Sequence, residues 1–385
     1  MQISKPRIIF LSPHDPNDVG TWSGTAHSMY QALLQSGLEV NAVRARWVDS
    51  IARLLGRLLR RLHFKSDITR SVIYASLASL EASIRVGLCK ADVIVAVTAA
   101  TYVFSLRSAK PVIFISDATF ACISQIYPDL SNMPRWLKRD ADKIERAALR
   151  SSKRIIFSSD WAKNSAIMDY QVSPALVRVL PLGPNISSQA LAEFEPDYSP
   201  DFQDGVRLLF IGADWRRKGG PVVLDIKRNL ESRGVPCEVF FVGNYPEGLA
   251  PERGVHLIGR LDKSDEKQLQ ELCRLYQSAH FFVLPTSAEA YGIVFSEAQA
   301  FGCPSLTFAV GGTPTAVKNG VTGFTLPITA NAGDFADTIC SLVRDPRQYG
   351  QISHNCRLRY ENEANWDVWG KSVLASVEEL CELLT

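Results

Sequence analysis

Short runs of aliphatic and β-branched residues recur along the chain, separated by longer stretches with helical periodicity. The first half has six such runs, at 7–13, 39–45, 93–98, 111–116, 154–159 and 176–181. The second half has six more, at 207–212, 238–243, 256–259, 281–285, 304–309 and 323–327. Because these runs alternate little with polar residues, they predict strands buried on both faces of a parallel sheet. Helices such as 264–278 and 293–301 supply the crossovers, so the pattern predicts an α/β protein.

The two series of runs are separated by a stretch that interrupts this pattern. Residues 181–205 are rich in Pro, Ser, Asp and Asn and carry no sustained apolar period, which is typical of a linker. We therefore expect two doubly wound, Rossmann-like domains, over 1–185 and 206–365, joined by a linker at 186–205. An amphipathic helix is expected in the last segment, 366–385. Ligands of such sheets bind beyond the carboxyl ends of the strands, in a cleft.

Composition excludes several classes of protein. The 385 residues include 42 Lys and Arg and 40 Asp and Glu, a net charge of +2, which argues against a globally basic nucleic-acid binder. The eight cysteines form no C-x-x-C pair and the six histidines are dispersed, which argues against a zinc site or a disulfide framework. The chain also lacks a long apolar span and a signal-peptide core at its start. We expect a cytoplasmic protein with no bound metal or other cofactor.

The segment 281–324 carries the densest group of candidate residues. A strand ends at Pro285, a polar loop follows, and a helix is expected to start near Gly292. The amides around this helix start belong to Ala290, Tyr291, Gly292 and Ile293. Such a helix N-terminus can hold a phosphate. Glu289 before it and Glu297 within it suit the two sugars of a nucleotide-sugar. The alternative is a capping acid and a surface glutamate.

A basic loop follows the first strand of the second half. Arg216, Arg217 and Lys218 precede a pair of glycines, and cations at a strand end can neutralise a diphosphate leaving group. The alternative is a solvated basic turn. A third turn, within 255–263, has backbone groups that could pair with a nucleobase, and we include its Arg260 among the donor-binding candidates.

These motifs resemble the retaining glycosyltransferases of family 4 (glycosyl transferases group 1), which have the GT-B fold. The resemblance rests on the E-x7-E spacing of Glu289 and Glu297, on "RKGG" before it, and on "FGCP" and "GGTPTAVKNGVTGF" after it. It covers nearly all of the chain and is densest over 207–325. It implies that Glu289 contacts the donor sugar, Glu297 the ribose, and Arg217 with Lys218 the diphosphate. Many members carry an arginine where this chain has Ala213.

The resemblance also assigns roles to the first half and the C-terminus. It implies that Gly24 lies in a loop beside the reaction centre and that Asp117 faces the sugar and the acceptor. For Gly24 the alternative is an ordinary flexible loop, and for Asp117 a helix cap. The helix at 366–385 is expected to pack back on the N-terminal domain, as in GT-B enzymes.

The function that follows is transfer of a hexose-type sugar from a nucleoside-diphosphate donor to a hydroxyl acceptor with retention of configuration. The acceptor would be a glycan, a lipid-linked saccharide or a glycolipid. Two alternatives stay open: a catalytically silent nucleotide-sugar-binding scaffold subunit, and another GT-B activity such as nucleotide-sugar epimerisation.

The segment 43–71 is much more basic than the rest of the chain. It holds eight Lys and Arg and two Asp, a net charge of +6. Apolar residues recur there at helical spacing, at Ile51, Leu54, Leu55, Leu58, Leu59 and Leu62. Arginines fall on the other side, at Arg53, Arg57, Arg60 and Arg61. Such a helix suits an anionic membrane surface, contacted through 51–65 on the inner face of the membrane. The alternative is a domain helix that packs its leucines on the sheet.

Overall fold

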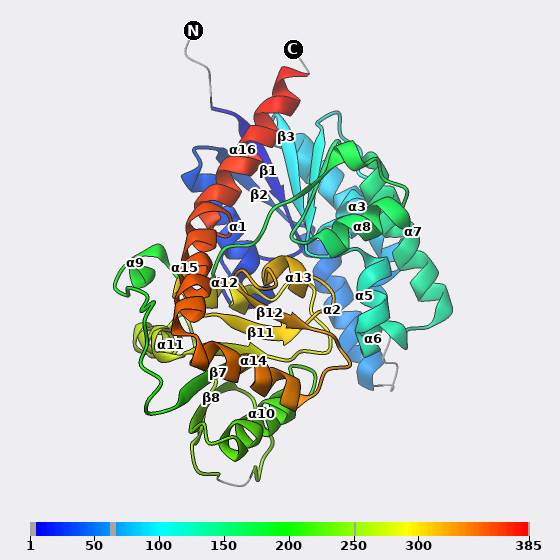
Figure 1. Ribbon diagram of the computed structural model, residues 1–385. Helices are drawn as coiled ribbons and strands as arrows, with labels where there is room; N and C mark the ends of the chain where they lie inside the picture. The colour runs from blue at the N-terminus through cyan, green and yellow to red at the C-terminus, as the bar shows by residue number, and fades with distance from the viewer. Residues whose placement is uncertain (1–4, 62–66, 250–251, 384–385) are drawn as a thin grey trace. The chain divides into compact units, whose positions relative to one another are not determined.

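The computed structural model describes residues 5–61, 67–249 and 252–383. The chain divides into two compact units, one formed by residues 1–181 with 366–385 and the other by residues 182–365 (Figure 1). Each unit contains one six-stranded sheet in which all pairings are parallel. The predicted α/β fold class is thereby confirmed, and each of the twelve predicted runs contains a strand.

The first unit has the strand order β2-β1-β3-β4-β5-β6. Its strands are β1 (Arg7–Leu11), β2 (Glu39–Val43), β3 (Val93–Val97), β4 (Val112–Ser116), β5 (Arg154–Phe157) and β6 (Val177–Val179). Its longer helices are α1 (Thr25–Gln35), α2 (Arg46–Arg61), α3 (Val72–Leu88), α7 (Arg135–Ser151), α8 (Asp160–Met168) and α16 (Trp366–Glu382). Shorter ones are α4 (Ala100–Val103), α5 (Phe120–Ile126) and α6 (Pro128–Ser131). The central strands β3 and β4 are buried at every position, as expected of strands covered on both faces.

The C-terminal helix α16 packs on this first unit, beside α1 (Figure 1). The two helices approach closely, because a Cβ at Gly370 would lie 2.6 Å from the carbonyl oxygen of Ala32. Farther along, the Glu379 carboxylate accepts hydrogen bonds from Arg154, at 2.6 Å, and Arg178, at 2.8 Å. A glycine contact and a charged cluster therefore hold the last helix to the N-terminal sheet.

The second unit has the strand order β12-β11-β10-β7-β8-β9. Its strands are β7 (Val206–Gly212), β8 (Cys237–Gly243), β9 (Val255–Gly259), β10 (Phe281–Leu284), β11 (Ser305–Phe308) and β12 (Gly323–Leu326). Its helices are α9 (Ser188–Leu191), α10 (Gly220–Ser232), α11 (Glu266–Ser278), α12 (Ile293–Ala300), α13 (Thr313–Ala316), α14 (Ala332–Arg344) and α15 (Pro346–Asn362). The central position of β7 brings the loop after it between the loops after β10 and β8.

Residues 186–205, predicted as a linker, lie within the second unit. Phe194 packs edge-on against Phe301, with ring centroids 5.8 Å apart, and Phe202 packs against His280 at 5.0 Å. The segment has little regular structure, in keeping with its Pro- and Ser-rich sequence, but its aromatic side chains are part of the packing of this unit.

The exposure of the apolar residues of α2 contradicts one of the two alternatives predicted for this helix. Ile51, Leu54, Leu55 and Leu58 are exposed, whereas α2 contacts the unit through smaller residues such as the buried Ala52. The alternative in which these leucines pack on the sheet is therefore wrong. The side chains of Leu59, Arg60 and Arg61, and residues 62–65, lie outside the described part. Among the described residues no helix is both long and apolar enough to cross a membrane.

Candidate active site

The loop after β7 is joined to the loop after β10. Gly219 precedes α10 in a left-handed conformation with φ of 86°, and a Cβ there would lie 2.2 Å from the carbonyl oxygen of Pro285. The Arg217 carbonyl accepts a hydrogen bond from the Ser287 amide, at 2.8 Å. Since β7 and β10 are neighbouring parallel strands, both loops lie at the same edge of the sheet.

This junction brings three predicted site residues together. The Lys218 ammonium forms an ion pair with the Glu289 carboxylate, and the two side chains are only 14% and 11% exposed. Arg217 donates from Nη1 to the Ala288 carbonyl, at 2.7 Å, and from Nε to the Asp214 carboxylate, at 3.3 Å. The loop carboxylate is therefore enclosed and paired with a cation, not solvated as a surface glutamate would be.

The helix start near Glu289 has the predicted form. Gly292, with φ of 87°, precedes α12, and a Cβ there would lie 2.6 Å from the Phe295 ring. In the described part of the chain, none of the amides of residues 290–293 donates to a protein acceptor. The Gly312 amide donates to the Glu289 carbonyl, at 3.1 Å, and so ties the loop after β11 to the same place. Unpaired amides at a helix N-terminus favour an anionic ligand.

Glu297 has surroundings that the sequence did not reveal. Its side chain is fully buried, and its Oε1 atom accepts from the Lys263 ammonium and from the Asn185 amide, at 3.3 Å. Its Oε2 atom accepts from the Tyr276 hydroxyl, at 2.9 Å. Burial and the neighbouring Glu297 carboxylate raise the pKa of Tyr276 well above its ordinary value, which keeps the phenol a donor. Both carboxylate oxygens of Glu297 therefore accept hydrogen bonds from protein donors.

Lys263 and Tyr276 were not predicted as site residues. Lys263 follows β9 in the same turn as Arg260, whose side chain is exposed. In the sequence, only its place in this turn could have pointed to Lys263 as a site residue. Tyr276 lies on the inward face of α11 and has no motif around it, since it looks like any core aromatic.

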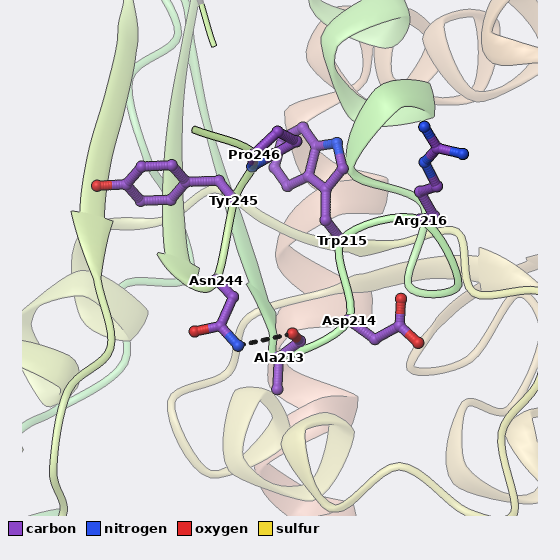
Figure 2. A pocket seen from close by; sticks show the side chains of 7 residues that line it. All are labelled: Ala213, Asp214, Trp215, Arg216, Asn244, Tyr245 and Pro246. Carbon is purple, nitrogen blue, oxygen red and sulfur yellow. Dashed lines mark hydrogen bonds between the residues drawn. The ribbon is translucent and has the colours of Figure 1, made fainter. Parts of the chain in front are cut away.

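A cavity of about 550 Å³ flanks the cation loop on its β8 side (Figure 2). It is lined by Ala213, Asp214, Trp215, Arg216, Asn244, Tyr245 and Pro246. The Asn244 side-chain amide donates to the Ala213 carbonyl, at 3.0 Å, and so joins the loops after β7 and β8, while Arg216 points away from this contact (Figure 2). This space is widely open to solvent, unlike the pockets that enclose most of a small ligand.

In the first unit, the loop that contains Gly24 contacts Asp117. Trp22, Ser23 and Gly24 have consecutive positive φ values of 49°, 56° and 84°, a run that costs free energy in non-glycine residues. The Trp22 indole Nε1 donates to the Asp117 carboxylate, at 3.2 Å. The cap of α5 is Thr119, whose hydroxyl accepts from the Cys122 amide. The capping alternative for Asp117 is therefore wrong, and the loop at Gly24 is a defined turn.

Glu145 lies buried in the same unit. Burial raises the pKa of this carboxyl to about 8, with Asp142 and Asp117 adding to the rise and Arg70 opposing it. Its Oε1 atom has no hydrogen-bond partner among the described residues. At neutral pH the folded protein therefore keeps a proton on Glu145 that the unfolded chain releases.

A pH dependence of stability follows from this shift. Between the ordinary pKa of 4.5 and about 8, the folded state binds more protons than the unfolded state, so stability falls as pH rises. The slope is at most about 1.4 kcal/mol per pH unit. We expect Glu145→Gln to gain stability relative to the unsubstituted protein as pH rises from 5 to about 8. Urea unfolding at both pH values measures this, with Asp129→Asn, an exposed acid of the same unit, as the control. Parallel pH profiles of Glu145→Gln and the unsubstituted protein would contradict it.

Gly219→Ala is expected to lower the free energy of unfolding by about 2 kcal/mol or more. Residue 219 has a left-handed backbone conformation that is unfavourable for alanine, and the new Cβ would also collide with the Pro285 carbonyl oxygen. The measurement is the free energy of unfolding in urea, because the collision would force the loops after β7 and β10 apart. Gly234→Ala is the matched control: Gly234 also has a positive φ, of 78°, but open space around its Cβ position. Equal losses at both glycines would show that conformation alone matters and that loop contact does not.

Comparisons with known proteins agree with this geometry. Residues 205–345, which include both joined loops, match the family model described as glycosyl transferases group 1. Among curated relatives, D-inositol 3-phosphate glycosyltransferase of Frankia alni is 29% identical over 252 residues, which are 60% of this chain and 60% of the relative. The chain thus spans less than two thirds of the length of that relative.

Solved structures resemble both units. Sucrose-phosphate synthase of Thermosynechococcus elongatus has a TM-score of 0.70 and 18% identity, and the match covers 99% of each chain. Anabaena HepE, solved in complex with UDP-glucose, has a TM-score of 0.59 and 15% identity, with 97% of this chain and 99% of that chain covered. At such identities the likeness is one of fold. Residues 205–345 are therefore similar to the group 1 glycosyl transferases, and the two parallel sheets have the GT-B fold.

Proposed function

We propose that this protein is a retaining glycosyltransferase of family 4. It would move a hexose-type sugar from a nucleoside-diphosphate donor to a hydroxyl of a glycan, a lipid-linked saccharide or a glycolipid. One observation carries the proposal: Arg217, Lys218 and Glu289 meet at adjoining strand ends, beside the amides that precede α12. The UDP-glucose bound by Anabaena HepE and the name of the Frankia relative support the same donor class and reaction type.

In this proposal the diphosphate leaves from the edge of the second sheet. Negative charge develops on the phosphate oxygens as the glycosidic bond breaks, and Arg217, Lys218 and the amides of residues 290–293 would stabilise it. The sugar acquires positive charge at the same time. Glu289 would orient the sugar and balance that charge, and the Lys218 ammonium, with which its carboxylate is paired, would keep the carboxylate close to the diphosphate. The acceptor hydroxyl would attack the anomeric carbon from the face that the phosphate leaves, which retains configuration, and would pass its proton to the departing phosphate oxygen.

Glu297 would bind the ribose of the nucleotide. Its carboxylate has two oxygens that now accept from Lys263, Tyr276 and the Asn185 amide. A ribose diol consists of hydroxyl donors, so it could replace the lysine as the partner of Oε1 without leaving a buried acceptor unpaired. Arg260, at the end of β9, is assigned to the nucleotide side, and the turn at Gly24 with Asp117 to the acceptor side.

A panel of nucleotide-sugars tests the proposal without knowledge of the acceptor. Thermal shift identifies the donor that binds, and release of the nucleoside diphosphate, with saccharide and lipid acceptors added, then measures turnover. Binding that raises the melting temperature follows from linkage. Binding without turnover would point to the silent scaffold subunit, and release of nucleotide with an altered free sugar would point to epimerisation.

We place the protein in the cytoplasm, in contact with the anionic inner face of a membrane.

A further inference from the structure

Helix α2 presents three distinct faces. Its inward face is formed by residues such as Val48, Asp49 and Ala52. A second face carries an exposed apolar stripe at i, i+4, i+7, i+8 and i+11, formed by Trp47, Ile51, Leu54, Leu55 and Leu58. The third face carries the exposed arginines Arg46, Arg53 and Arg57. Because one turn holds about 3.6 residues, the arginines run alongside the stripe, next to it on the helix surface.

Helix α3 carries a second exposed apolar stripe. It consists of Ile73, Leu77, Leu80, Ile84 and Leu88, again at helical spacing and all more than half exposed. The opposite face of α3 is buried through small residues, including Ala75, Ala78 and Ala82. The sequence did not single out this helix, because an apolar stripe of this kind is what a core-packing helix also shows.

The two helices that carry the stripes contact each other. The amides of Trp47 and Val48 donate to the Glu81 carboxylate of α3, at distances down to 2.9 Å. The Arg85 guanidinium lies 4.9 Å from the centre of the Trp47 ring, and Arg85 follows Ile84 directly. Trp47, which is 70% exposed, therefore lies where the two helices contact each other. Ten large apolar side chains exposed on two contacting helices differ from the singly scattered apolar residues that are normal on a protein surface.

The charge of this region indicates what covers the patch. Residues 43–110 hold twelve Lys and Arg and four Asp and Glu, a net charge of +8, whereas the rest of the chain is at −6. Of the four acids, Asp49 and Glu81 are buried and form ion pairs with Arg44 and Arg85, so the excess charge of the region lies on its other cations. An apolar patch with cations alongside it complements a bilayer with anionic headgroups. A second copy would bring an equally basic face against this one, which opposes pairing.

We propose that α2 and α3 dock together on an anionic lipid bilayer, with both apolar stripes entering the interface and Arg46, Arg53 and Arg57 among the headgroups. This deepens the membrane contact included in the proposed function, and rests on it. The sequence alone led us to expect membrane contact through residues 51–65. In the present proposal α3 contributes half of the apolar contact. A lipid-linked or glycolipid acceptor would then reach a protein already held at the surface that contains it.

The test is sedimentation of the full chain with vesicles of phosphatidylcholine alone or mixed equally with phosphatidylglycerol. We expect binding to the mixed vesicles that weakens as salt rises. Three double variants should each reduce it about tenfold or more: Leu54→Gln/Leu58→Gln on α2, Leu77→Gln/Ile84→Gln on α3, and Arg53→Gln/Arg57→Gln. The control is Met168→Gln/Ile328→Gln, which removes two exposed apolar side chains elsewhere and should bind normally. All substituted residues are exposed, and melting temperatures verify that the variants fold.

Three results would overturn the proposal. They are no binding to either kind of vesicle, unchanged binding in the α3 variant, and a dimer of the unsubstituted protein that the stripe variants abolish while vesicle binding stays absent. The last result would assign the patch to a second copy. Nucleotide release is measured on the same samples without vesicles. If the unsubstituted protein releases nucleotide normally but binds no vesicles, the docking surface alone is contradicted. If it binds vesicles normally but releases no nucleotide, the transferase alone is contradicted.

Discussion

Glu289→Gln is expected to lower the rate of sugar transfer about 100-fold or more, because a preorganised charge at the reacting centre is commonly worth that much. Glutamine keeps the size of the side chain and removes only its charge. The loop itself should persist, since it is held by the Ser287 amide and the Gly312 amide, whose bonds do not involve this carboxylate. Nucleotide binding should change little, so the loss should fall on kcat and not on KM.

The measurement is nucleotide release and product formation with the donor found by thermal shift. Glu361→Gln is a matched control, because it removes a carboxylate that is paired with an arginine, at 2.7 Å, on the surface of the same unit. Turnover by Glu289→Gln equal to that of the control would remove Glu289 from the reaction. A rise in KM with normal kcat would make it a ground-state binding residue instead.

The fold could be predicted because it depends on properties that the chain carries locally. Each of the twelve apolar runs corresponds to a strand, although the edge strands β2 and β9 are less buried than predicted. Parallel strands with helical crossovers place the carboxyl ends of β7 and β10 on the same side of the sheet. The sequence analysis did not predict the strand order, which makes β7 and β10 neighbours and so brings Lys218 to Glu289, with Gly219 allowing the close approach of the two loops.

The surroundings of Glu297 and the exposure of α2 could not be predicted in the same way. The partners of Glu297 lie 34 and 21 positions away, on a turn and a helix whose side chains meet only after folding. The leucines of α2 have a spacing that suits either a core or a membrane, so periodicity alone cannot say which way they face. What decides it is that small residues such as Ala52 pack inward. At Asp117, two capping residues compete within "SDATF", and Thr119 takes the cap.

Lys218→Met is expected to lower the free energy of unfolding by about 2–3 kcal/mol, because it leaves the enclosed Glu289 carboxylate without its cation. The double variant Lys218→Met/Glu289→Gln should recover most of that loss, since neither buried charge then remains. Urea unfolding of the single and double variants gives the coupling free energy of the pair. The matched control is the exposed pair of Lys318 with Glu363, 2.7 Å apart, where Lys318→Met should cost no more than about 1 kcal/mol.

The same two variants separate stability from ligand binding. If Lys218 holds the diphosphate, the double variant should be nearly as stable as the unsubstituted protein and still bind the nucleoside diphosphate more weakly, by about tenfold. Calorimetric titration of the free nucleotide measures this without any acceptor. A double variant that binds the nucleotide normally would limit Lys218 to holding Glu289 in place, and Arg217 with the amides before α12 would then carry the phosphate contact alone. A double variant less stable than Lys218→Met would contradict the pairing itself, because removing both charges cannot cost more than stranding one.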